Sequence, residues 1–105
     1  MIDKRQDDRL RVRFDVKLAA GVESREGTLL DVSRGWAKVL ATGAGVQPGD
    51  EVRLSVVRRA GKPVDLTGHV VWSDAKQFAL QFGGLSEAAQ RWLSSLLEEE
   101  TTAIR

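Results

Sequence analysis

Hydrophobic and polar residues alternate along much of the chain. From residue 10 to residue 18 every second residue is apolar, and charged residues fill the positions between them, in the sequence LRVRFDVKL. A period of two places successive side chains on opposite faces of a β-strand. The segment therefore predicts a strand with one buried face and one charged, solvated face.

Five further segments have the length and composition of short strands. They cover residues 27–32, 36–41, 51–56, 66–72 and 78–82, and segments that contain glycine, proline or aspartate separate them. Such residues mark turns between extended segments. Six short strands with turns between them predict a small antiparallel barrel or sandwich.

The period of the apolar residues changes after residue 84. Apolar residues now recur at spacings of three and four, which is typical of one face of an amphipathic helix. They are Ala89, Trp92, Leu93, Leu96 and Leu97. Ser86 is suited to cap the start of this helix, with Glu87 in its first turn. We expect the helix to close an open end of the barrel, and the alternative is a partner-binding helix or a dimer seam.

Three aromatic side chains and the histidine are assigned from the same patterns. Trp72 and Phe82 are expected in the barrel core, and Trp92 is expected to anchor the helix. His69 alternates outward beside Val70 and is expected on the strand surface. The glycines at positions 43 and 45 lack the spacing of a dinucleotide-binding loop and predict a turn.

Composition narrows the classes of function. The chain has 105 residues, which fits one domain, and it contains no cysteine and a single histidine. These counts exclude disulfides and thiolate zinc sites and leave no histidine pair for a metal. A net charge of +1 gives no reason to expect non-specific nucleic-acid binding. No stretch resembles a signal peptide or a membrane span, so the sequence predicts a cytoplasmic protein without a membrane association.

Two short motifs carry the chemistry of the chain. Arg5 and Arg9, separated by three residues, precede the first predicted strand, and the sequence DVSRGW runs from Asp31 to Trp36 between the second and third strands. Isolated, each motif has an ordinary explanation. The arginines would form a solvated basic arm, and Asp31 and Ser33 would cap the backbone of a turn.

The order and spacing of these motifs resemble those of the PilZ family. PilZ domains are bacterial receptors for cyclic di-GMP, with an RxxxR motif before the barrel and a [D/N]xSxxG motif on its surface. The sequences GHVVW at 68–72 and FALQF at 78–82 are similar to the last two strands of the family. The resemblance covers nearly the whole chain and implies an all-β fold, a six-stranded antiparallel barrel with a C-terminal α-helix.

The resemblance assigns the ligand-binding residues. Arg5 and Arg9 match the two arginines of the first motif, and Asp31 and Ser33 match the second, which also includes Gly35 and Trp36. A planar guanidinium can bind a phosphate or guanine through two hydrogen bonds and can stack on a base. An aspartate can accept hydrogen bonds from guanine N1 and N2, and a serine hydroxyl can bind nearby. A second RxxxR pair, Arg9 and Arg13, lies closer to Asp31 than the family spacing.

The chain departs from the family pattern in two places. Trp36 stands where the final glycine of the second motif belongs, and it is expected to block the pocket, to stack on guanine or to point into the core. Gly35 is expected to supply the turn with part of the lost flexibility. Asp7 and Asp8 lie between the two arginines and would lower the affinity for a phosphate.

The sequence thus predicts a single-domain cyclic di-GMP receptor that is not an enzyme. Residues 1–9 are expected as a flexible arm, 10–97 as barrel and helix, and 98–105 as an acidic tail. Ligand binding would order the arm and change contacts with a protein partner. The protein is expected to be a monomer or weak dimer, and no cofactor, metal or nucleic-acid polymer is expected as a ligand. One alternative is an adaptor that has lost the ligand, and another is a nucleic-acid-binding barrel of the OB or SH3 type, for which stacking aromatics are scarce.

Overall fold

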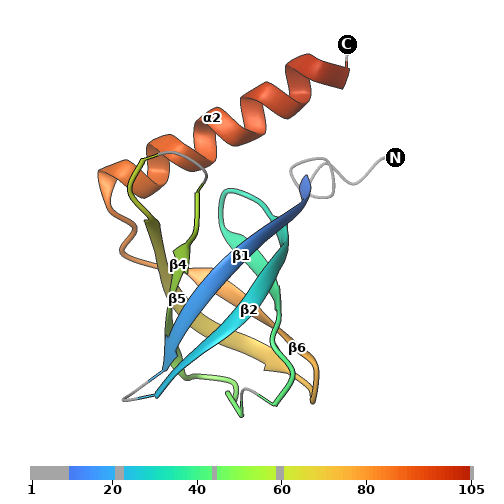
Figure 1. Cartoon of the computed structure of the whole chain (residues 1–105), viewed down its shortest axis with the longest axis vertical. Coiled ribbons are helices and arrows are strands. Elements are labelled where there is room, and N and C mark those ends of the chain that lie inside the picture. Colours follow the sequence, from blue (N-terminus) through green and yellow to red (C-terminus); the bar gives the residue numbers. More distant parts are fainter. Residues whose placement is uncertain (1–9, 21–22, 44, 59–60, 105) are drawn as a thin grey trace.

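The computed structural model describes residues 10–20, 23–43, 45–58 and 61–104 of the chain. Within these residues the chain folds into a barrel with a helix across one end (Figure 1). The predicted ligand-binding residues Arg5 and Arg9 lie outside the described residues. None of the described helices is long and apolar enough to span a bilayer.

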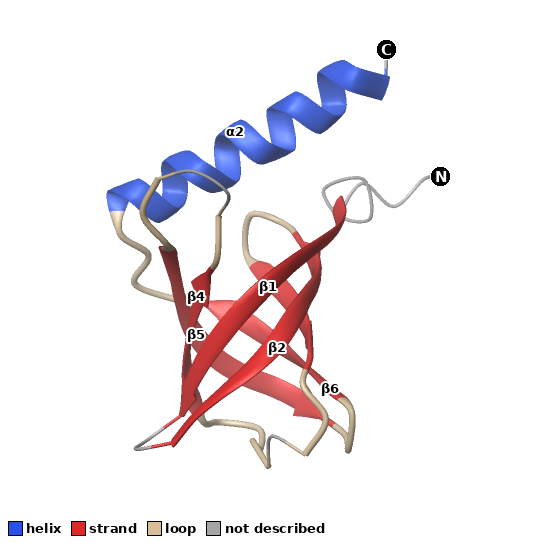
Figure 2. Cartoon of the chain, in the orientation of Figure 1, coloured by secondary structure: helices blue, strands red, loops and turns tan. Residues whose placement is uncertain are grey.

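Six strands close into an antiparallel barrel (Figure 2). Going round the barrel, the order of the strands is β1, β2, β3, β6, β5, β4, and β4 pairs with β1 to close it. Their bounds are β1 Leu10–Ala20, β2 Glu23–Val32, β3 Trp36–Leu40, β4 Glu51–Val56, β5 Val64–Ser73 and β6 Gln77–Phe82. The structure confirms the six-stranded barrel with a C-terminal helix, and several strands are longer than the sequence predicted.

The barrel interior is filled by the inward side chains of all six strands. The largest of the fully buried side chains is Phe78, which packs with leucines and valines of the other strands. The alternation of buried and exposed residues in β4 follows the predicted period of two. Burial of these apolar surfaces is the main contribution to the stability of the fold.

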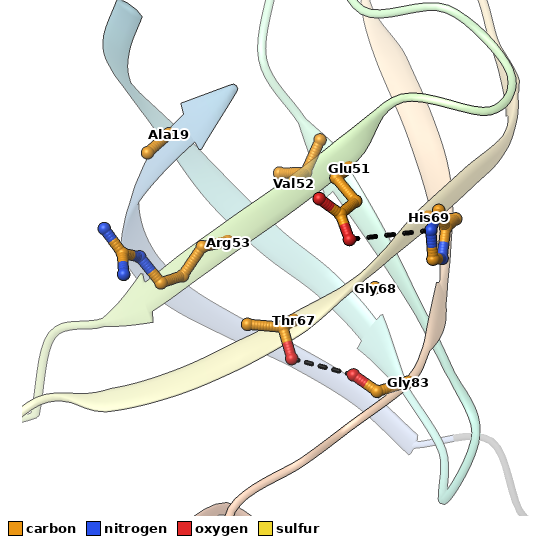
Figure 3. Close-up of a pocket in the computed structure, with 8 residues that line it drawn as sticks. All are labelled: Ala19, Glu51, Val52, Arg53, Thr67, Gly68, His69 and Gly83. Atoms are coloured by element: carbon orange, nitrogen blue, oxygen red, sulfur yellow. Dashed lines mark hydrogen bonds and ion pairs between the residues drawn. The ribbon is translucent and has the colours of Figure 1, made fainter. Parts of the chain in front are cut away.

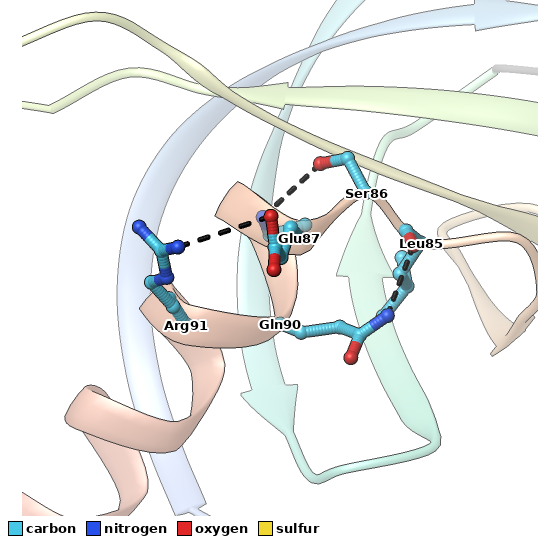
Figure 4. Close-up of polar contacts among 6 residues, drawn as sticks. Leu85, Ser86, Glu87, Gln90 and Arg91 are labelled. Atoms are coloured by element: carbon cyan, nitrogen blue, oxygen red, sulfur yellow. Dashed lines mark hydrogen bonds and ion pairs between the residues drawn. The ribbon is translucent and has the colours of Figure 1, made fainter.

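Helix α2 (Glu87–Ile104) covers the end of the barrel at which β1 begins (Figure 1). The hydroxyl of Ser86 accepts a hydrogen bond from the backbone N–H of Ala89 at 3.1 Å, which confirms the predicted N-cap (Figure 4). Ala89 and Leu93 are buried in the barrel core. The ring of Trp92 packs edge-on against Phe14, with 5.5 Å between the ring centroids. Trp92 is therefore the anchor that the sequence predicted.

The helix is longer than expected. It continues to Ile104, so residues 98–104, which we expected as an acidic tail, are helical. Glutamate and leucine have high helix propensity, and no glycine or proline stands after residue 84 to end the helix. An acidic sequence does not by itself mark the end of a helix.

Strand β5 contains an irregularity that corrects the prediction for Trp72. Val70 pairs with Leu80 and Trp72 pairs with Ala79, so Val71 is an extra residue in β5. Such a β-bulge shifts the alternation of side chains by one residue. Trp72 is consequently on the outer surface, 41% exposed, and is not in the core. Phe82 is partly buried against the core, and His69 is exposed as predicted.

Candidate functional site

The turn between β2 and β3 carries the predicted second motif. The backbone N–H of Ser33 donates to the carbonyl oxygen of Trp36 at 2.9 Å. The Ser33 hydroxyl in turn accepts from the N–H groups of Trp36 at 3.2 Å and Gly35 at 3.4 Å. Ser33 is buried and caps the backbone of the turn. Its hydroxyl hydrogen can still be donated to another acceptor.

Gly35 does not use the conformational freedom of glycine. Its φ is not in the left-handed region, and a Cβ atom added to it would meet nothing within 4 Å. Its carbonyl oxygen accepts a hydrogen bond from the N–H of Phe82 at 2.9 Å, which ties the turn to the end of β6. The turn therefore depends on the carbonyl group of Gly35 and on Ser33, and not on the flexibility that we expected of Gly35.

Trp36 is the first residue of β3 and its side chain points outward. It is 45% exposed, so the expectation that it lies in the core is wrong. Among the described residues only glycines have positive φ, and the backbone at position 36 accordingly accepts a large side chain without strain. The two other interpretations, an obstruction and a stacking platform, both require this outward position.

Asp31 lies between two basic residues on the outer surface of the barrel. It pairs with Arg11 of β1 on one side and with Lys38 of β3 on the other. Its carboxylate oxygen is 4.0 Å from the Lys38 Nζ, at the limit of an ion pair, and its side chain is 16% exposed. An ion pair of this length on the surface contributes at most about 1 kcal/mol. The carboxylate can therefore exchange Lys38 for a ligand at little cost.

The start of the barrel lies beside this motif. Leu10, the first residue of β1, pairs with Val32, which stands between Asp31 and Ser33 in the sequence. The chain that carries Arg5 and Arg9 thus leads into the barrel next to the two polar residues of the second motif. The structure does not describe the arginines themselves, and their place in the site stays a prediction.

The sequence prediction missed Arg11 and Lys38 as neighbours of Asp31. Alternation along β1 does place Arg11 on the outer face, and Lys38 has the same orientation in β3. Which residues stand opposite one another depends on the register of the strands, including the bulges in β1 and β2 near Asp31. The alternation of side chains indicates the face on which each residue lies, but it does not identify the residue opposite it on the next strand.

The surface of the described part of the chain has depressions on both sides of the end of β6 and elsewhere, and two of them bear on the site. The larger, about 540 Å³, lies over β4 and β5, and Glu51, Arg53, Thr67 and His69 line it (Figure 3). Its polar groups partly satisfy one another, since Thr67 donates to the Gly83 carbonyl at 2.8 Å and His69 is 3.8 Å from Glu51. Of the predicted site residues that the structure describes, Asp31, Ser33, Gly35 and Trp36, none lines this depression.

The smaller depression, about 360 Å³, separates the β2–β3 turn from α2. Arg34 and Gly35 of the second motif form one wall, and Leu93 of the helix lies on the other side. The helix end here is held by local contacts, among them the Gln90 amide, which donates to the Leu85 carbonyl at 3.1 Å (Figure 4). The β2–β3 turn and the first turns of α2 therefore border the same depression.

Comparison with known proteins adds a family and a fold. The model of the PilZ domain family matches residues 3–99 of the chain. No match was found among curated proteins. The Bacillus subtilis inhibitor of motility MotI/DgrA superposes with a TM-score of 0.78 at 20% identity, over 99% of this chain and 54% of its own. The chain thus spans about half the length of that protein.

Two isolated domains of known structure superpose over most of their own length. One is the domain of CeSA from a cellulose-synthesizing bacterium, with a TM-score of 0.71 and 17% identity over 89% of this chain and 97% of that one. The other is the domain of YcgR from Escherichia coli, solved with c-di-GMP, with a TM-score of 0.71 and 15% identity over 89% and 90%. At these identities the likeness shows the fold.

Proposed function

The chain belongs to the PilZ domain family, and from this membership we propose that it is a cytoplasmic receptor module for cyclic di-GMP, not an enzyme. The observation that carries the proposal is the pairing of Leu10 with Val32. This pairing sets Leu10 beside the motif that holds Asp31 and Ser33, and it supports a site to which Arg5 and Arg9, earlier in the sequence, contribute. A similar barrel, that of YcgR, has been solved with this dinucleotide.

Each site residue has a role that its chemistry supports. Arg5 and Arg9 bind the phosphates and guanine from the N-terminal segment, because a guanidinium offers two parallel donors to these groups. Asp31 accepts hydrogen bonds from guanine N1 and N2, while Arg11 and Lys38 on either side add positive charge for the phosphates. Ser33 holds the turn that positions Asp31 and can donate its hydroxyl hydrogen to the ligand.

Ligand binding is coupled to a protein partner through the turn and the helix. When the dinucleotide binds, residues 1–9 become ordered around it, and this changes the surface beside β1 that a partner can contact. Part of the binding free energy offsets the entropy that the segment loses. The hydrogen bond from the Phe82 N–H to the Gly35 carbonyl ties the same turn to the end of β6, and the turn and α2 border one depression. The partner surface is then the face formed by the turn, the N-terminal segment and the helix.

Isothermal titration calorimetry with cyclic di-GMP tests the proposal. We expect the wild type to bind, and Arg9→Ala and Asp31→Ala each to bind roughly ten- to 150-fold more weakly, because a hydrogen bond to a charged group contributes about 1.5–3 kcal/mol. Arg91→Ala is the matched control: Arg91 is 78% exposed on α2, and its ion pair with Glu87 is on the helix surface (Figure 4). Cyclic di-AMP, which lacks the guanine N2 donor, should bind more weakly than cyclic di-GMP to the wild type.

Absence of heat at high micromolar cyclic di-GMP would refute the receptor proposal. A second candidate, an adaptor that has lost the ligand, would then follow, and the exposed Trp36 in place of the family glycine is the observation that favours it. An adaptor of this kind recovers the same protein partner in a pull-down with and without cyclic di-GMP. Under the receptor proposal, addition of the dinucleotide changes the amount of partner recovered.

A further inference from the structure

The two depressions described above are joined by a row of residues that crosses neighbouring strands. Gly83, which follows β6, lines both of them. Its N–H donates to the carbonyl oxygen of Thr67 in β5 at 3.0 Å, and Thr67 pairs with Arg53 of β4. On the other side of β6, Gly83 shares the smaller depression with Arg34 of the β2–β3 turn. The row therefore begins at one arginine and ends at another.

Two glycines form a low saddle in the middle of this row. Gly83 and Gly84 are both exposed, and a Cβ atom added to either would meet nothing within 4 Å. Because neither residue has a side chain, only backbone separates the two depressions. We call the surface that runs from Arg53 over these glycines to Arg34 the glycine groove.

The two ends of the glycine groove carry positive charge that is available to a partner. Arg34 and Arg53 are exposed, and neither guanidinium has a hydrogen-bond or ion-pair partner among the described residues. Glu51, the acidic residue among the described lining residues, is 3.8 Å from His69, and the Arg53 side chain points away from it (Figure 3). A guanidinium offers parallel N–H donors that match a carboxylate. The ends of the groove therefore favour acidic side chains.

The part of the groove beside α2 combines apolar surface with polar groups. Leu93 is buried, and Phe82 and Leu85 are half-buried at its walls. The Gln90 amide donates to the Leu85 carbonyl, which leaves its side-chain oxygen as an acceptor, and the Ser94 hydroxyl lies on the same wall. Such a surface suits an apolar side chain together with the N–H and carbonyl groups of an extended backbone.

The length of the groove sets the length of the segment that fits it. Neighbouring strands lie about 4.8 Å apart, so three steps across them place the Cα atoms of Arg34 and Arg53 about 14 Å apart. An extended chain advances about 3.3 Å per residue and covers this distance in about four residues. Two acidic residues four apart in an extended segment therefore reach both arginines.

We propose that the glycine groove binds an extended segment of a partner protein in which two acidic residues, four apart, flank an apolar residue. The acidic side chains bind Arg34 and Arg53, and the apolar side chain packs against the wall that includes Leu93. The inference deepens the proposed function and rests on it for the role of the groove as the partner surface of the receptor. Arg34 belongs to the second motif, so a dinucleotide bound at that turn lies beside one end of the groove.

NMR titration with two synthetic peptides tests the groove. The probe is ETLTE, blocked at both ends, in which the two glutamates are four apart and a leucine lies between them. KTLTK, the charge-reversed peptide, is its matched control. In amide correlation spectra of the isotopically labelled chain, ETLTE should shift the backbone signals of Gly83 and Gly84 and the side-chain amide of Gln90, and KTLTK should not.

Three variants locate the binding surface. Gly83→Leu fills the saddle and should abolish binding of ETLTE, and the fold should be retained because φ at this position lies outside the left-handed region and the space above it is open. Arg53→Glu should weaken binding roughly five- to 30-fold, since an exposed ion pair is replaced by repulsion of similar size. Lys17→Glu is the matched control: Lys17 is exposed on β1 beside Ser55, and its reversal should leave the affinity unchanged.

Four results would overturn the proposal. They are the absence of shifts at millimolar ETLTE, equal shifts with KTLTK, equal weakening in Lys17→Glu and Arg53→Glu, and shifts of the same signals on concentrating the protein alone, which would mean that a second copy of the chain occupies the groove. If Gly83→Leu weakens binding of cyclic di-GMP as much as binding of the peptide, the groove belongs to the dinucleotide site and the proposal is again wrong. The peptide titration needs no dinucleotide, so its failure refutes the groove alone, whereas calorimetry without heat refutes the receptor alone.

Discussion

Replacing Gly68 by alanine tests how closely β5 and β6 approach each other in the barrel. A Cβ atom at position 68 would lie 2.1 Å from the carbonyl oxygen of Gln81 and 3.0 Å from the Cα of Phe82. Both are backbone atoms, so no side chain can rotate to make room. To restore ordinary contact distances, the two strands would have to separate by on the order of 1 Å.

The energetic cost follows from that separation. The hydrogen bond from the Gly83 N–H to the Thr67 carbonyl, now 3.0 Å long, borders the site and would be stretched beyond bonding distance. Loss of a hydrogen bond costs about 0.5–1.5 kcal/mol and overpacking about 1–3 kcal/mol. We therefore expect Gly68→Ala to lower the free energy of unfolding by about 3 kcal/mol, which corresponds to a decrease in Tm of roughly 10–20 °C for a domain of this size.

Two other glycines provide controls for this argument. At Gly27 an added Cβ would be 2.8 Å from the Leu40 carbonyl oxygen, a milder conflict, and at Gly35 it would meet nothing. In urea denaturation followed by tryptophan fluorescence, Gly68→Ala should lose the most free energy of unfolding and Gly27→Ala less. Gly35→Ala should be neutral or up to about 1 kcal/mol more stable, because alanine restricts the unfolded chain. A Gly68→Ala protein within about 1 kcal/mol of the wild type, at the same m-value, would refute the reasoning.

Three further predictions concern single polar groups. Ser33→Ala leaves two backbone N–H groups of the β2–β3 turn without their acceptor and should cost about 1–3 kcal/mol in urea denaturation, whereas Ser33→Thr, which keeps the hydroxyl, should cost less. Ser86→Ala removes the N-cap of α2 and should cost about 1 kcal/mol, with Ser86→Asp close to the wild type; an equal loss in both would contradict a capping role. Hydrogen bonds from the backbone of Lys76 and Gln77 hold the pKa of Asp74 below its ordinary value of 3.8. The carboxylate therefore stabilises the fold above pH 3.8, and this contribution is lost as the pH falls through the lower folded-state pKa, so the stability difference from Asp74→Ala should shrink in denaturation curves taken below that range.

The strands and the helix could be predicted because their apolar periods differ. Alternation in β1 and β4 and the three-and-four spacing in α2 specify which side chains are buried without reference to any partner strand. The position of the second motif, at the turn after β2, followed in the same way. The end of α2 could not be located, because the acidic residues after Leu97 are good helix formers and no capping residue ends the pattern.

The surface roles of two tryptophans could not be predicted. In β3 the outward set of Trp36, Lys38 and Leu40 contains two large apolar side chains, whereas the inward residues Ala37 and Val39 are small, so the size of the apolar residues does not indicate which face is buried. The contacts of Asp31 with Arg11 and Lys38 depend on register across three strands. Register is decided by packing in three dimensions and by bulges, which a list of residues does not contain.

The extra residue in β5 has a consequence for comparing relatives of this protein. Val71 changes the parity of every later position in the strand, so an insertion or deletion of one residue there would exchange an indole on the outside for one inside without altering the amino-acid composition. Aligned columns that contain tryptophan need not represent the same surface. Homologues are better matched by counting residues from the bulge. A relative that lacks the extra residue would have the side chain at the position of Trp72 inside the barrel.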